Sequence, residues 1–257
     1  MNIDSIKYVY LIGIGGIGMS ALARYFRYLG CQVAGYDRTE TALTKQLVAE
    51  GIPVIYTDDF RLIDDVFKQD STHTLIIYTP AIPKELTLPE AFRQLGYTLL
   101  KRSQVLGLIS RDRYAIAVAG THGKTTTSTM IAHILHDSGY GCAAFLGGIS
   151  TNYNSNVLFS DQKAVVLEAD EYDRSFLTLH PDIAVVTSAD ADHLDIYGDK
   201  AQLEESFRLF LGQVHEDGTS IIKEGLPFSG DVSYTATGKA DAYADRVHIE
   251  DGEFYFD

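Results

Sequence analysis

The chain has 257 residues, of which 46% are hydrophobic, so it can form one large domain or two smaller ones. Its formal net charge of −14 argues against a nucleic-acid partner, because such binding needs clustered lysine and arginine. No apolar run approaches membrane-spanning length, the N-terminus lacks a signal-peptide layout, and two cysteines, Cys31 and Cys142, cannot build a disulfide framework. We therefore expect a cytoplasmic enzyme with no membrane insertion.

Strand and helix patterns alternate along the first part of the chain, which is typical of a parallel α/β fold. Apolar runs predict strands, and apolar residues at helical spacing predict helices that stop at glycine. The predicted strands cover 8–13, 32–37, 74–78 and 98–101, and the predicted helices cover 18–29, 41–50 and 88–95.

A new strand–loop–helix unit begins after the polar residues 110–113, so we place a domain boundary near residue 111 and predict domains at 1–110 and 111–257. The second domain has predicted strands at 114–118, 142–146, 164–167, 183–187 and 219–223, and a predicted amphipathic helix at 201–214. Alternation about Asp251 and Gly252 predicts a hairpin over 246–256. Its second strand has scarcely begun where the sequence stops, so we expect a truncated polypeptide.

A phosphate-binding loop is the most informative feature of the second domain. It follows the apolar strand 114–118 and leads into a helix, so backbone N–H groups, the helix N-terminus and the charge of Lys124 converge on one point. Lys124 would reach the β- and γ-phosphates of ATP, and the Thr125 hydroxyl would bind Mg²⁺. The predicted ATP-binding residues are Gly120, Thr121, His122, Gly123, Lys124, Thr125 and Thr126.

A second glycine-rich motif lies near the N-terminus, between a predicted strand and a predicted helix. It comprises Gly13, Gly15, Gly16, Ile17 and Gly18, and Asp37 follows at the end of the next strand. The pattern predicts a diphosphate at a helix N-terminus, and Asp37 could accept a ribose hydroxyl. A nicotinamide cofactor and a UDP-linked sugar satisfy it equally, and glycines that serve only tight helix packing are the structural alternative.

Acidic residues follow two predicted strands of the second domain. Glu168 ends the strand after the phosphate loop and is the expected Mg²⁺ ligand, whereas Asp170, Glu171 and Asp173 could instead cap the next turn. The segment DADHLD at 190–195 follows the strand that ends near residue 187. Its His193 is a metal-ligand candidate, although a lone histidine near acids is more often a structural hydrogen-bond partner.

Together these residues resemble the Mur ligases, which add amino acids to peptidoglycan precursors. The matching segments are LIGIGGIGMSALA at 11–23, GTHGKTTT at 120–127, EADE at 168–171 and DHLD at 192–195. They span nearly the whole chain in the family's order and spacing. The glycine motif followed by Met-Ser-Ala favours the alanine-adding members, or the related murein-tripeptide recycling ligases, over the later-acting ones.

The resemblance implies a Rossmann-like domain that binds a UDP-sugar, followed by a P-loop-type α/β domain, here partial, that binds ATP. The 15–18 loop would hold the diphosphate, with Asp37 and the turn at Thr79 and Ala81 near the uridine. The resemblance also implies Gly147, Gly148 and Asn152 as contacts of the sugar nucleotide. Lys124, Glu168 and His193 would be the catalytic residues. Thr125 and Glu168 would bind one Mg²⁺ and His193 a second.

The implied reaction joins L-alanine to UDP-N-acetylmuramate through an acyl phosphate at the expense of ATP, in a monomer or homodimer. Relatives continue into a third domain, so we expect this chain to bind ligands with little or no ligation. Many relatives have asparagine where this chain has Ser188, so any contact made by that amide is in doubt here. Two alternatives remain: an NAD-dependent oxidoreductase built on the first glycine motif, and a nucleotide-binding module without catalysis.

Overall fold

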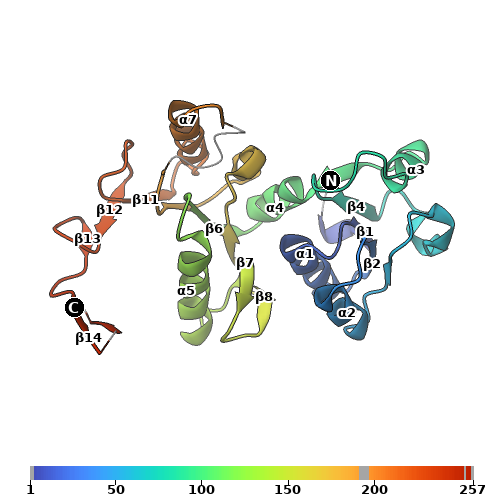
Figure 1. Cartoon of the computed structure of the whole chain (residues 1–257), viewed down its shortest axis with the longest axis horizontal. Coiled ribbons are helices and arrows are strands. Elements are labelled where there is room, and N and C mark those ends of the chain that lie inside the picture. Colours follow the sequence, from blue (N-terminus) through green and yellow to red (C-terminus); the bar gives the residue numbers. More distant parts are fainter. Residues whose placement is uncertain (1–2, 191–196, 252, 256–257) are drawn as a thin grey trace.

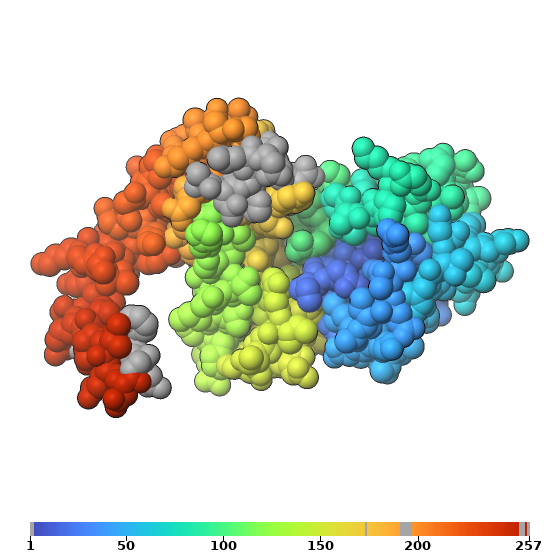
Figure 2. All heavy atoms as spheres, in the orientation of Figure 1, coloured from blue at the N-terminus to red at the C-terminus, as the bar shows by residue number. Residues whose placement is uncertain are grey.

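The computed structural model describes residues 3–190, 197–251 and 253–255, and it contains two parallel α/β sheets. Figure 1 shows the N-terminal sheet with its helices at one end of the molecule and the second sheet in the middle. The segment that carries β12 to β15 extends from the second sheet at the other end, and Figure 2 shows it standing apart from the body. The predicted α/β fold is confirmed.

The first sheet has the strand order β3-β2-β1-β4-β5, with every neighbouring pair parallel. Its strands are β1 (Tyr8–Ile12), β2 (Gln32–Tyr36), β3 (Val54–Ile55), β4 (Thr74–Tyr78) and β5 (Leu99–Lys101). Its helices are α1 (Ile17–Tyr28), α2 (Ala42–Ala49), α3 (Leu88–Gln94) and α4 (Arg102–Arg111), with short 3₁₀ segments η1 (Ile3–Ser5), η2 (Phe60–Leu62) and η3 (Asp65–Phe67).

Successive residues of β1 point to opposite faces of this sheet. Val9 and Leu11 belong to a core cluster shared with α1 and α4, whereas Tyr10 and Ile12 belong to a separate cluster with α3 and η3. The sheet is therefore buried on both faces, as parallel sheets usually are.

The second sheet has the strand order β13-β12-β11-β10-β6-β9-β7-β8, and its β7–β8 pair is antiparallel while the others are parallel. Its strands are β6 (Tyr114–Ala119), β7 (Ala143–Ser150), β8 (Ser155–Leu158), β9 (Ala164–Glu168), β10 (Ile183–Val186), β11 (Thr219–Lys223), β12 (Val232–Thr235) and β13 (Ala242–Tyr243). The remaining elements are α5 (Lys124–Asp137), η4 (Tyr172–Thr178), α7 (Lys200–Leu211) and the antiparallel hairpin β14 (His248–Glu250) and β15 (Glu253–Tyr255).

One hydrophobic core joins the two sheets. Residues of α1 and α4 pack against strands of both, so these helices lie between the sheets. The rings of Tyr25 on α1 and Phe145 on β7 have centroids 5.0 Å apart. α5 instead covers the opposite face of the second sheet, where Ala132 packs in its own cluster with Ala144 and Val166. The glycine motif that begins α1 is thereby held close to the second sheet.

The predicted strands and helices are confirmed to within a few residues, and the predicted hairpin forms β14 and β15. One helix and four strands were missed. No element was predicted over residues 102–109, where most of helix α4 lies, and strands β3, β8, β12 and β13 were not predicted either. Among the helices that the structure describes, none combines the length and apolar character needed to cross a bilayer.

Candidate functional site

The phosphate loop connects β6 to α5, as the sequence indicates. Gly123, the residue before α5, has φ +83°, a conformation that glycine adopts without strain. No side chain among the described residues caps the start of α5. The first N–H groups of this 14-residue helix therefore remain available to an anion.

Residues at the end of β10 hold the loop in place. The Ser188 hydroxyl accepts a hydrogen bond from the His122 N–H at 2.7 Å and lies 2.9 Å from the Thr121 hydroxyl. The Thr187 hydroxyl donates to the carbonyl oxygens of Ala119, at 3.1 Å, and His122, at 2.5 Å. Ser188 thus has a defined role here in shaping the loop.

Lys124 turns back into the loop. Its ammonium group donates to the Gly120 carbonyl oxygen at 2.6 Å and lies 2.9 and 2.8 Å from the two carboxylate oxygens of Glu171, whose side chain is fully buried. The Tyr197 hydroxyl donates to the backbone carbonyl of Glu171, and burial raises the pKa of Tyr197 to about 12. Sequence reasoning offered Glu171 only as a turn cap, a role that Asp170 fills by accepting from the Tyr172 N–H at 3.0 Å.

Glu168 and Thr125, the two candidate Mg²⁺ ligands, both lie beside the glycines of β7. The Gly147 N–H donates to the Glu168 carboxylate at 2.9 Å, and a side chain at Gly147 would overlap that carboxylate. A Cβ atom at Gly148 would lie 3.6 Å from the Thr125 methyl group. A carboxylate and a hydroxyl beside a phosphate loop suit Mg²⁺, which keeps several waters and binds few protein groups, so these residues fit the ion.

The structure adds less about the other predicted metal ligand. His193 falls outside the described residues, as do Asp192 and Asp195. Within the described part of the chain, no group of three or more histidine, cysteine, aspartate or glutamate residues could hold a metal ion. Asn152 lines a cavity of about 320 Å³ together with Thr125 and Thr126, on the phosphate-loop side of the second sheet.

The N-terminal glycine motif lies at the start of α1 and is the other candidate anion cradle, the first in chain order. No side chain among the described residues caps this 12-residue helix, whose N-cap residue is Gly16. The Asp37 carboxylate accepts a hydrogen bond from the Gly15 N–H at 2.7 Å, which holds the backbone of the glycine loop. A Cβ atom at Gly13 would lie 2.5 Å from the Thr79 methyl group, which places the predicted turn at Thr79 beside the motif.

A cavity of about 220 Å³ lies where the turn at Thr79, the start of α4 and the segment after β9 meet. It is lined by residues from both parts of the chain: Thr79, Pro80, Ala81, Arg102, Ser103, Asp170, Tyr172 and Ser175. Arg102, which begins α4, contacts Gly18 of the first cradle and faces the negative charges of Asp170 and Glu168 beside the second. One arginine therefore lies against the glycine motif and near the carboxylates at the end of β9.

Two family models match most of the chain. The Mur ligase family catalytic-domain model matches residues 8–114, and the Mur ligase middle-domain model matches residues 118–244. The chain belongs to the Mur ligase family. Curated relatives named UDP-N-acetylmuramate–L-alanine ligase, from Christiangramia forsetii and Flavobacterium johnsoniae, are each 49% identical over the whole chain. The chain spans 56% and 57% of their lengths.

Solved structures of other Mur ligases have the same fold. A UDP-N-acetylmuramate–alanine ligase from Thermotoga maritima matches 93% of this chain and 55% of its own, with a TM-score of 0.80 and 27% identity. A UDP-N-acetylmuramate:L-alanyl-γ-D-glutamyl-meso-diaminopimelate ligase from Neisseria meningitidis matches 97% of this chain and 86% of its own, with a TM-score of 0.82 and 25% identity.

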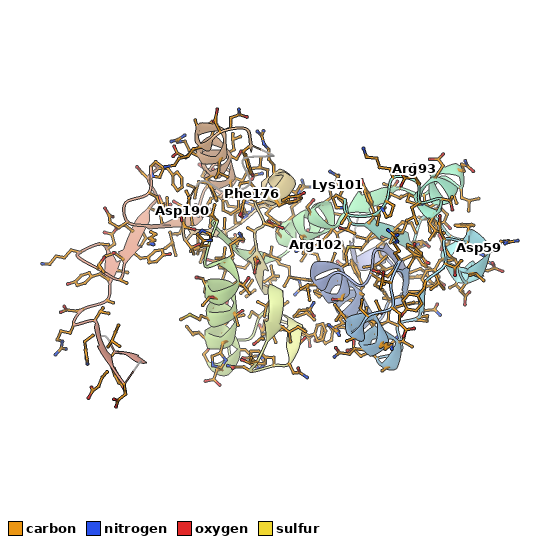
Figure 3. The ribbon with its side chains drawn as sticks, viewed as in Figure 1. Asp59, Arg93, Lys101, Arg102, Phe176 and Asp190 are labelled. Atoms are coloured by element: carbon orange, nitrogen blue, oxygen red, sulfur yellow. The ribbon has the colours of Figure 1, made fainter. Side chains whose placement is uncertain are left out.

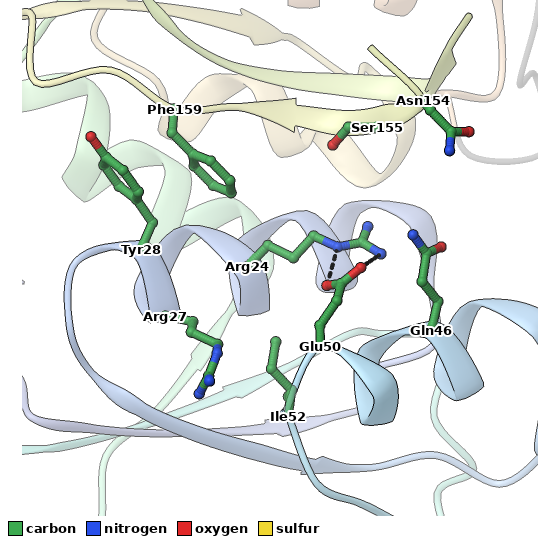
Figure 4. Close-up of a pocket in the computed structure, with 9 residues that line it drawn as sticks. All are labelled: Arg24, Arg27, Tyr28, Gln46, Glu50, Ile52, Asn154, Ser155 and Phe159. Atoms are coloured by element: carbon green, nitrogen blue, oxygen red, sulfur yellow. Dashed lines mark hydrogen bonds and ion pairs between the residues drawn. The ribbon is translucent and has the colours of Figure 1, made fainter.

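This Mur ligase chain has a further cavity, of about 430 Å³, near the C-terminal end of α1. Figure 4 shows residues of α1 and α2 on one side and Asn154, Ser155 and Phe159 on the other. Arg24 forms an ion pair with Glu50 at 2.7 Å there, so its charge is already matched. None of the predicted site residues lines this cavity.

Proposed function

We propose that this chain is the UDP-sugar- and ATP-binding part of a ligase that joins L-alanine to UDP-N-acetylmuramate. The observation that carries the proposal is the pair of uncapped helix N-termini, at α1 and α5. Arg102 lies against the first of them and near the carboxylates of Asp170 and Glu168. Each terminus can bind phosphate. A sugar nucleotide on the first and ATP on the second would bring a sugar acid toward a triphosphate.

In the proposed reaction, a carboxylate oxygen of the sugar acid attacks the γ-phosphorus of ATP, and the bond to ADP breaks. The resulting acyl phosphate is attacked at its carbonyl carbon by the amine of L-alanine. Phosphate leaves and the amine nitrogen loses a proton, which gives an amide. Lys124 would stabilise negative charge on the transferring phosphoryl group once it leaves its partners in the loop. The same reaction, which consumes ATP, leads us to propose a cytoplasmic location.

Mg²⁺ would neutralise phosphate charge when bound, and we propose that Glu168 and Thr125 hold it. Gly147 positions the Glu168 carboxylate through its N–H, so the carboxylate is oriented before any ligand arrives. His193 remains our proposed ligand for a second Mg²⁺. Asp37, Thr79 and Ala81 remain proposed contacts of the uridine end.

L-alanine is the proposed amino acid because the relatives that cover the whole chain are named for it and are nearly half identical. The Neisseria structure, with its comparable TM-score, supports a second candidate in which a tripeptide takes the place of alanine. An NAD-dependent oxidoreductase would leave the phosphate loop and the Glu168 carboxylate without a use.

A Lys124→Ala change tests the ATP assignment. We expect binding of ATP·Mg²⁺, measured by calorimetry, to weaken by at least about tenfold, because a charge-assisted contact to phosphate is lost. Binding of UDP-N-acetylmuramate should be unchanged, and alanine ligation by the full-length enzyme should be abolished. Lys200→Ala on α7, where the side chain is 60% exposed, is the control. Normal ATP binding or normal turnover by the Lys124 variant would refute the assignment.

A further inference from the structure

Arg102, which was not among the predicted site residues, lies against the first cradle. Figure 3 shows it in the middle of the molecule, where α4 passes between the two sheets. A Cβ atom at Gly18 would overlap its guanidinium group, so the guanidinium lies directly against the backbone of the first turn of α1. Only glycine permits this approach.

One N–H group of the Arg102 guanidinium has no acceptor in the described part of the protein. Its Nε atom is buried and, within the described residues, has no hydrogen-bond partner. Burial lowers the pKa of Arg102, and the negative charges of Asp170 and Glu168 oppose that shift. A guanidinium stays protonated in proteins. A buried N–H donor of a charged group without an acceptor is costly, and an anionic ligand would remove that cost.

The surroundings of Arg102 favour an anion that is part of a larger ligand. The guanidinium and the uncapped N-terminus of α1 converge on the glycine motif, and both favour negative charge. The adjoining cavity of about 220 Å³ continues from Arg102 past Thr79 and Ala81 on one side and Asp170 on the other. An anion at the cradle therefore has room beside it for the rest of a larger ligand.

We infer that Arg102 binds the diphosphate of the sugar nucleotide jointly with the N-terminus of α1. This inference rests on the proposed function. A guanidinium presents several N–H donors in a plane, which matches the oxygens of a diphosphate. Its contact with Gly18 places these donors at the helix terminus. Arg102 also reduces repulsion between the bound diphosphate and the carboxylates of Asp170 and Glu168.

Because Arg102 begins α4, which packs against both sheets, it binds the nucleotide from the junction of the two domains. Thr178 of η4 donates to the Ser103 carbonyl at 2.7 Å, and the His180 N–H donates to the Ser110 hydroxyl at 3.0 Å. These bonds tie α4 to the second domain at both ends. A ligand held by α1 and Arg102 therefore contacts elements that fix how the two domains meet.

The test compares Arg102→Gln and Arg102→Lys with the wild-type chain by calorimetry. UDP-N-acetylmuramate and UDP-N-acetylglucosamine share the diphosphate, and only the first has the sugar carboxylate, so both are titrated. We expect Arg102→Gln to weaken the binding of both nucleotides by about 10- to 100-fold, because a charge-assisted hydrogen bond is lost. The affinity of Arg102→Lys for both nucleotides should lie between those of Arg102→Gln and the wild type. Arg111→Gln, at the exposed other end of α4, is the matched control.

ATP·Mg²⁺ affinity and the thermal unfolding midpoint separate binding from folding. Both should be unchanged in the Arg102 variants. If Arg102→Gln binds both sugar nucleotides with the affinity of the wild type, the inference is overturned. Weakening of UDP-N-acetylmuramate alone assigns Arg102 to the carboxylate and overturns the diphosphate contact, and a general loss together with a lower midpoint shows a structural role. A wild-type chain that binds neither sugar nucleotide refutes the proposed function itself.

Discussion

At the scale of single residues, the buried pair of Lys124 and Glu171 governs the phosphate loop. Glu171 is fully buried and Lys124 is 14% exposed, so removal of either charge leaves the other without compensation in a poorly hydrated place. The pair therefore holds the lysine within the loop, and in the proposed function the oxygens of a phosphate would compete with Glu171 for it. Ser188 and Thr187 fix the backbone around it through short contacts.

We predict that Glu171→Gln lowers the free energy of unfolding by about 3 kcal/mol, because the ammonium of Lys124 loses its buried counter-charge. Urea denaturation measures this loss. The exposed pair of Lys45 and Glu40, 2.6 Å apart, gives the control, and Glu40→Gln should change stability by less than about 0.5 kcal/mol. A Glu171→Gln chain as stable as the Glu40→Gln chain would show that the buried pair contributes nothing.

At the scale of elements, α1 unites the two sheets. Asn156 on β8 is fully buried, and its amide donates to the Ile17 carbonyl at 2.5 Å and to the Ser20 hydroxyl at 3.0 Å. Its oxygen accepts from Arg24 at 2.7 Å. One side chain of the second domain thus makes three hydrogen bonds with the helix that carries the first anion cradle.

We predict that Asn156→Ala costs about 2 kcal/mol of stability, since it leaves buried polar groups of α1 without their partner. Chemical denaturation followed by tyrosine fluorescence would measure it. Gln162→Ala, in the exposed turn before β9, is the control. If both variants unfold at the same urea concentration as the wild type, Asn156 does not hold the domains together.

Local patterns account for the elements that the sequence predicted. Strand β1 and helix α1 follow from an apolar run, a glycine turn and helical spacing, all within about 20 residues. Helix α4 was missed because its formation depends on tertiary contacts. Val105 and Ile109 are buried between two sheets, and the local sequence does not predict this burial. The phosphate loop was predicted for a similar reason, since its strand, its glycines and Lys124 are close together in the sequence. The partners Glu171, Ser188 and Arg102 come from distant segments, so only the fold brings them to the two cradles.

At the scale of the whole molecule, one core supports the two loops that we propose to bind phosphate groups. Both loops follow the carboxyl ends of parallel strands, β1 and β6, where α/β proteins usually bind ligands. Since α1 and α4 pack against both sheets, the relative placement of the loops is set by buried contacts. A sugar nucleotide and ATP would then occupy separate sites on one framework.

Calorimetry with the wild-type chain tests this account most directly. UDP-N-acetylmuramate should bind with a stoichiometry of one, and it should bind equally when ATP·Mg²⁺ is already saturating. NADH should give no binding heat. Displacement of UDP-N-acetylmuramate by ATP·Mg²⁺, or binding of NADH in place of the sugar nucleotide, would contradict two separate sites for a sugar nucleotide and a triphosphate.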